Sequence, residues 1–63
     1  MKYKVEYQVK DETRIHRRYY DALSASIAKE MFEATREESL VGFAIIDKSI
    51  KIFHKDKNGN WKE

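Results

Sequence analysis

One stretch near the start of the chain decides the fold: KYKVEYQVK, residues 2–10, in which apolar and charged or amide side chains alternate. Tyr3, Val5, Tyr7 and Val9 take every second position. Successive side chains of a β-strand point to opposite faces of a sheet, so this two-residue period is typical of a half-buried strand. Aromatic and β-branched residues also have high strand propensity. We therefore expect one buried and one solvent-exposed row of side chains.

A second strand is predicted at residues 13–20, joined to the first by a polar turn at residues 11–12. A two-residue loop would place Tyr7 opposite His16, whereas a three-residue loop would pair Tyr7 with Ile15. A shift of one residue exchanges the two faces of a strand. Because the three-residue loop buries Ile15, we expect that register.

A helix follows, from Asp21 or Ser24 to about Glu37. Both starting residues are plausible N-caps, since either side-chain oxygen can accept a hydrogen bond from a first-turn amide. Apolar and small residues recur at three- and four-residue steps, which is the pattern of one buried helical face. This stripe consists of Ser24, Ile27, Ala28, Met31, Phe32 and Thr35.

Two apolar runs, residues 40–46 and 50–53, fill most of the last third and are interpreted as strands. Residues 47–49 between them are either a hairpin turn or a bulge in one long strand, and the hairpin gives the more consistent apolar face. Further on, Asn58-Gly59 is a strong turn signal, because both residues tolerate a positive φ. We expect this turn to fold Trp61 and Lys62 back as a short edge strand.

The predicted fold class is α+β: a small antiparallel sheet, β-β-α-β-β along the chain with a short C-terminal hairpin, and one helix packed on one face. At 63 residues, the sequence corresponds to a single domain spanning residues 1–63. The predicted core consists of Val5, Tyr7, Val9, Ile15, Tyr19, Ile27, Met31, Phe32, Phe43, Ile45, Ile50 and Ile52.

Signs of catalysis are weak in this sequence, and we expect the protein not to be an enzyme. Cysteine is absent, serines are scattered, and His16 and His54 lie in separate segments without a surrounding motif. The two histidines lack an indicated third ligand, so no metal site is predicted. A glycine-rich phosphate loop is also missing, and no cofactor is expected.

Charge is distributed unevenly although the net charge is only +2. Residues 1–20 and 41–63 are basic, and residues 21–40 are acidic. The segment RIHRRYY, residues 14–20, interleaves cations with aromatic rings, as surfaces that bind nucleic acid do. The solvated face of an ordinary antiparallel sheet is, however, also rich in Lys, Arg and Glu.

The favoured interpretation is a small, non-enzymatic binding module that contacts RNA or DNA through a basic strand face. The residues expected to carry this contact are Arg14, His16, Arg17, Arg18 and Tyr20, with Lys2 and Lys4 in support. In the expected register Arg17 points toward the helix side, whereas the other residues share the outer face. Among the aromatic residues, Tyr20 is the expected stacking platform, because Tyr19 is assigned to the core.

The alternative is a protein–protein adaptor or accessory protein. It would act through an edge strand or through the acidic helix residues Glu30, Glu33 and Glu37, and edge-strand pairing could produce a homodimer. No apolar run reaches the roughly 18 residues of a transmembrane helix, so no membrane partner is expected. The absence of cysteine suits a reducing compartment, and the expected localisation is cytoplasmic.

Overall fold

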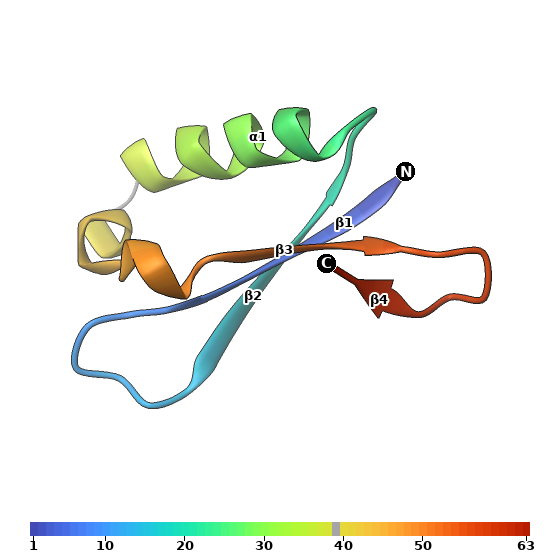
Figure 1. Ribbon diagram of the computed structural model, residues 1–63. Helices are drawn as coiled ribbons and strands as arrows, with labels where there is room; N and C mark the ends of the chain where they lie inside the picture. The colour runs from blue at the N-terminus through green and yellow to red at the C-terminus, as the bar shows by residue number, and fades with distance from the viewer. Residues whose placement is uncertain (39) are drawn as a thin grey trace.

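Four antiparallel strands and one α-helix make up the structure, a computed structural model that describes residues 1–38 and 40–63. Their order along the chain is β1 (Lys2–Gln8), β2 (Ile15–Asp21), α1 (Ala25–Glu37), β3 (Lys51–Lys55) and β4 (Trp61–Lys62). In the sheet the strands lie in the order β2-β1-β3-β4, and α1 runs along one face (Figure 1). The α+β class and the β-β-α-β-β order expected from the sequence are therefore confirmed.

Strand β1 is a central strand, paired with β2 on one side and with β3 on the other. Tyr3, Val5, Tyr7 and Val9 are all buried beneath α1 and the segment that follows it. The residues between them point to the other face, called here the open face, which α1 does not cover. The alternation of the first nine residues thus separates the two faces as expected.

The expected register of β1 and β2 is wrong by one residue. Tyr7 lies opposite His16, and Glu6 lies opposite Arg17. The turn forms because Asp11 adopts a positive φ of 68°, which aspartate tolerates better than most residues. The Glu12 amide then donates to the Val9 carbonyl at 3.1 Å. As a result the odd-numbered residues of β2, Tyr19 among them, lie on the open face.

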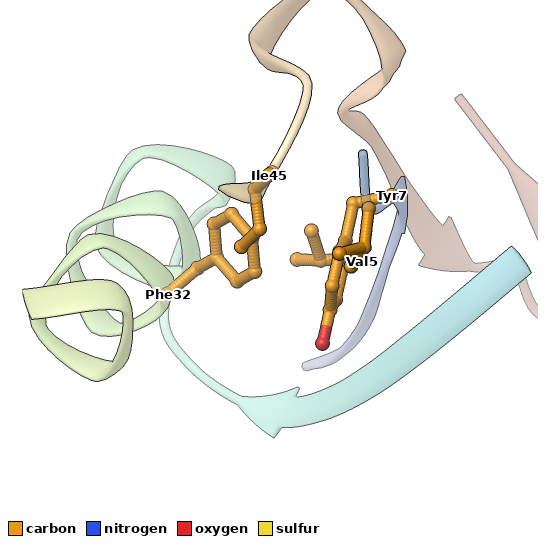
Figure 2. Packing of buried hydrophobic residues seen from close by; sticks show 5 residues of the cluster. Val5, Tyr7, Phe32 and Ile45 are labelled. Atoms are coloured by element: carbon orange, nitrogen blue, oxygen red, sulfur yellow. The ribbon is translucent and has the colours of Figure 1, made fainter. Parts of the chain in front are cut away.

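Helix α1 begins after Ser24, whose Oγ accepts a hydrogen bond from the Ile27 amide at 3.3 Å. This decides between the two expected caps. Ala28 and Phe32 are fully buried, and the Phe32 ring lies between α1, the Val5 and Tyr7 side chains of β1, and Ile45 (Figure 2). Ile27, from the same expected stripe, remains 38% exposed. Ala28 lets the helix approach the sheet, and Phe32 fills the space between them.

The strand expected at residues 40–46 is not formed. Instead a 3₁₀ helix, η1, spans Leu40–Ala44, and Ile45 makes one isolated bridge with Val9. Chain geometry favours this compact path, because Gly42 packs directly on the helix backbone, where a Cβ would overlap the Arg36 carbonyl oxygen. Residues 47–49 form neither of the two alternatives considered: they are a second 3₁₀ helix, η2 (Asp47–Ser49).

The β1–β2 register, the 3₁₀ helix η1 and the orientation of α1 together change which residues form the core. Phe43 lies on η1 and is 81% exposed, and Tyr19 on the open face is 63% exposed. The expected core residues that turn out to be exposed are Ile15, Tyr19, Ile27, Met31 and Phe43. Tyr3, Ala22 and Ala28 are buried in addition to those expected. Ile50 and Ile52 are partly buried and pack against the core.

The C-terminal hairpin is confirmed. Gly59 has a φ of 82°, and Trp61 pairs with Lys55 as β4 folds back against β3 (Figure 1). Asp56 closes the turn, because its Oδ1 accepts hydrogen bonds from the Asn58 and Asn60 amides, both at 2.9 Å. These amides hold the pKa of Asp56 below its ordinary value.

The structure turns α1 so that Phe32 faces the sheet and Met31 is partly exposed, and substitutions at these two neighbouring residues test this orientation. Phe32→Ala empties a fully buried site and should lower the free energy of unfolding by about 3–5 kcal/mol. Met31→Ala removes a side chain that is 39% exposed and should cost less than about half as much. Urea denaturation followed by circular dichroism measures both values, and loss of the cooperative transition in Phe32→Ala counts as the large effect. Equal losses in the two variants would show that the helix is rotated differently.

Candidate nucleic-acid interface

The observed register divides the expected nucleic-acid residues between the two faces of the sheet. Lys2, Lys4 and Arg17 lie on the open face, by their alternation along β1 and β2. Arg14 precedes β2, where its Nε is 3.4 Å from a carboxylate oxygen of Glu12. The structure therefore does not bring the expected set together on one surface.

The remaining three residues, His16, Arg18 and Tyr20, belong to the helix-side face, and two of them contact Tyr7. The His16 ring stacks on that of Tyr7, with 5.3 Å between centroids and an interplanar angle of 17°. The Arg18 Nε donates to the Tyr7 hydroxyl at 3.4 Å. Tyr20 packs against both parts of the core, and its hydroxyl is buried with no partner among the described residues. Tyr20 therefore cannot be the exposed stacking platform that the sequence suggested.

Different aromatic rings occupy the open face, and lysines lie beside them. The residues are Lys4, Tyr19, Phe53, Lys55 and Trp61. The Tyr19 and Trp61 rings contact each other, with centroids 5.8 Å apart and planes tilted by 50°. The Lys4 ammonium lies 4.8 Å from the Phe53 ring centroid and 5.2 Å from that of Trp61. The Lys55 ammonium is 5.5 Å from the Trp61 centroid. Cations are thus held against aromatic faces, an attractive arrangement.

An ion-pair network fixes the centre of this face. Glu6 Oε2 is 3.1 Å from the Arg17 Nε and 3.3 Å from the Lys4 ammonium. Desolvation acts to raise the pKa of Glu6, but the hydrogen bonds from Lys4 and Arg17 outweigh it and hold the pKa below its ordinary value. The Lys4 side chain is only 13% exposed, although it is a lysine on an uncovered face. Its ammonium is therefore positioned rather than free in solvent.

The open face is predominantly basic. Among the described residues, its strand positions carry five cations against two carboxylates, Glu6 and Asp21. The five cations are Lys2, Lys4, Arg17, Lys51 and Lys55. A groove of about 450 Å³ lies at one end of this face. Its lining includes Lys2, Tyr19, Asp21, Lys55 and Trp61 from the open face, together with Tyr3 and Tyr20 from the helix-side face. Aromatic and charged side chains therefore line the same groove.

The acidic residues of the alternative interpretation lie on α1. Glu30, Glu33 and Glu37 line a broad, shallow depression on the helix surface. Glu33 also pairs with Arg36 at 3.2 Å, and the Arg36 guanidinium reaches Asp47 of η2 at 2.8 Å. One of the three carboxylates is thus partly used to hold the helix end in place.

The sequence did not identify Tyr19, Phe53 and Trp61 as a shared surface. Tyr19 was assigned to the core because of the expected register, and Phe53 was counted as part of an apolar run. The missing signal was alternation across β3, where Lys51, Phe53 and Lys55 share one face with the lysines of β1. Recognising it requires knowing that β3 pairs directly with β1.

Within the part of the chain that the structure describes, no three His, Asp or Glu side chains come together to hold a metal ion. Among the same residues, no helix has the length and apolar character needed to cross a membrane. Comparisons with protein-family models, with curated proteins and with solved structures find no match to this chain.

The ion pairs of Glu6 predict a specific pH dependence of stability. Because the folded-state pKa is lowered, these pairs stabilise the fold above the unfolded value of about 4.3, and the contribution is lost as pH falls through the folded pKa. Glu6→Gln should lower stability at neutral pH by up to about 1 kcal/mol. Its unfolding free energy should then fall less steeply than that of the wild type between about pH 5 and pH 3.

Urea denaturation across that pH range measures both slopes. Glu12, Asp21 and Asp56 also have lowered pKa values and contribute to both proteins, so the difference between the slopes isolates Glu6. Coinciding slopes would mean that Lys4 and Arg17 do not engage this carboxylate in solution.

Proposed function

We propose that the protein binds nucleic acid through the open face of its sheet. The observation that carries the proposal is the coincidence of aromatic rings, the exposed Tyr19 and the half-buried Phe53 and Trp61, with an excess of cations on the face that α1 leaves uncovered. Phosphates attract lysine and arginine, and bases stack on aromatic rings, so the two features together match a polynucleotide. A basic face without rings would match any anion.

Charge placement supports the same ligand. Lys2 and Arg17 are ion-paired with Asp21 at 3.5 Å and with Glu6 at 3.1 Å. Their side chains are nevertheless 67% and 49% exposed, which leaves them accessible to phosphate groups at the rim of the face. The Lys4 ammonium sits between the Phe53 and Trp61 rings near the centre. The acidic outer side of α1 lies across the molecule from this face, so a polyanion would approach from the sheet side. Association should therefore depend strongly on ionic strength.

The proposal predicts that neutralising two open-face lysines weakens binding. Lys51→Gln/Lys55→Gln should lower the affinity for oligonucleotides at about 50 mM salt by at least about fivefold. It should also reduce the slope of log affinity against log salt concentration by about one for each phosphate that a lysine no longer neutralises. Fluorescence anisotropy of labelled RNA and DNA oligonucleotides, titrated at about 50 and 200 mM salt, measures both quantities.

A matched control removes the same charge elsewhere. Lys29 lies on α1 and Lys48 on η2, so Lys29→Gln/Lys48→Gln changes net charge equally while leaving the open face intact. This control should keep the wild-type slope. If both double variants weaken binding equally, the interaction depends on net charge alone and not on the open face. If the protein binds no oligonucleotide at the lower salt, the proposal is wrong.

A second candidate is a protein partner on the acidic side of α1. It is favoured by Glu30, Glu33 and Glu37 on one shallow surface and by the exposed ring of Phe43, close to Glu33 and Glu37. Glu30→Gln/Glu37→Gln would weaken such a complex and leave nucleic-acid binding intact.

The charges on the outer edge of β2 argue against a homodimer that pairs through this strand. In a symmetric antiparallel pair centred on β2, Arg17 and Arg18 lie at the middle of the strand. They would face, or nearly face, their own copies, and like charges directly opposite each other destabilise strand pairing. Edge-to-edge association through this strand is therefore disfavoured by charge.

A further inference from the structure

The Tyr19 side chain is largely exposed to solvent, and its ring is also held in place by a neighbouring ring. Its side chain is 63% exposed, yet its ring is not free, because it leans on Trp61 with 5.8 Å between centroids. One side of the ring is thus supported, and the remainder is open to solvent. An aromatic ring held in place before a ligand arrives loses little conformational freedom on binding.

Three cations surround this pair of rings. Lys4 and Lys55 lie against Trp61, at 5.2 and 5.5 Å from its centroid, and Lys2 lines the same groove as Tyr19. A base stacked on the rings would therefore have its phosphates within reach of ammonium groups. The groove volume of about 450 Å³ falls in the range of roughly 300–1,000 Å³ found for ligand pockets.

Among the described residues, Asp21 is the one acidic side chain that lines the groove. Its Oδ1 accepts a hydrogen bond from the Met1 ammonium at 3.2 Å, and its Oδ2 lies 3.5 Å from the Lys2 ammonium. The side chain is still 68% exposed, so each oxygen keeps room to accept a further hydrogen bond. An ionised carboxylate only accepts hydrogen bonds and would repel a phosphate placed against it. The 2′-hydroxyl of ribose is a donor that matches it, and deoxyribose lacks this group. Asp21 thus favours RNA over DNA at the same position.

From these features we infer that the ligand of the open face is single-stranded RNA, with one or two bases stacked on Tyr19 and Trp61 and the ribose facing Asp21. The inference rests on the proposed function and narrows it. Charge complementarity between the basic face and the phosphates supports the choice of a polynucleotide over a protein.

The bases of a duplex could not stack on the Tyr19 and Trp61 rings. Its bases are already stacked within the helix, and it offers mainly phosphates and sugars to a flat surface. The deep, narrow major groove of A-form RNA does not admit side chains in a way that exposes base faces. Only unpaired bases can lie against Tyr19 and Trp61.

The experiment compares end-labelled oligonucleotides of one sequence as single-stranded RNA, single-stranded DNA and RNA duplex, at about 50 mM salt. We expect single-stranded RNA to bind at least about tenfold more tightly than the duplex. Trp61 is the only tryptophan of the chain, so quenching of its fluorescence reports directly on base stacking. The duplex should leave this fluorescence nearly unchanged.

Three variants separate stacking from charge. Tyr19→Leu keeps an apolar side chain but removes the ring, and should weaken single-strand binding about 5- to 100-fold. Tyr19→Phe keeps the ring and should bind within about twofold of the wild type. Phe43→Leu removes an even more exposed ring from η1, off the sheet, and should have no effect. Circular dichroism confirms that each variant is folded.

The outcomes distinguish this inference from the proposed function. Equal binding of duplex and single strand, with Tyr19→Leu harmless, would overturn the inference while nucleic-acid binding stands. Equal binding of RNA and DNA single strands, unchanged in Asp21→Asn, would overturn the assignment to RNA. No binding of any oligonucleotide at the lower salt would overturn the proposed function itself, and this inference with it.

Discussion

The two-residue alternation of β1 is the constraint on which the rest of the molecule depends. Every other strand pairs with β1 or with its neighbour β3, and α1 packs on the row formed by Tyr3, Val5 and Tyr7. The charged row between these residues supplies the centre of the opposite face. A single residue shift in β1 would move its apolar row into water and its lysines against the helix. The same alternation of residues in β1 therefore places one row of side chains in the core and the other row in the candidate interface.

The open face is built from interactions that are individually modest. Surface ion pairs and cation–ring contacts typically contribute about 1 kcal/mol or less each. Here they are joined, because Lys4 contacts Glu6, Phe53 and Trp61 together. The result is a face whose charged groups already have defined positions. Such preorganisation lowers the entropic cost of binding, whichever ligand the face accepts.

Local signals in the sequence were sufficient wherever a residue's own backbone preference decides the structure. Strand β1 and the turn at Asn58-Gly59 were predicted, and Ser24 was one of the two expected caps, since each depends on propensity or on a nearby hydrogen bond. The acidic and basic segments were also recognised. These features required no knowledge of which distant segments pair.

Features set by tertiary contacts were not predictable in the same way. Strand β2 carries rings and cations on both faces, and the register was chosen because it buries Ile15, which also placed Tyr19 in the core and Tyr20 outside it. The Asp11 turn and the Tyr7–His16 stack instead fix the register in which Tyr7 lies opposite His16. Likewise the apolar run at residues 40–46 resembles a strand until Gly42 is seen packed against the Arg36 backbone. The aromatic surface was missed because it exists only after β3 joins β1.

The central position of β1 also sets an order on how the molecule can form. Its partner β2 follows immediately, but its other partner is β3, and the pair Tyr3–His54 encloses nearly the whole chain. During synthesis the N-terminal hairpin can form early, yet one side of β1 offers unpaired backbone groups until residues 51–55 emerge from the ribosome. Strand β3 therefore joins late, and when it covers the exposed edge of β1 it brings Phe53 and Lys55 to the open face together.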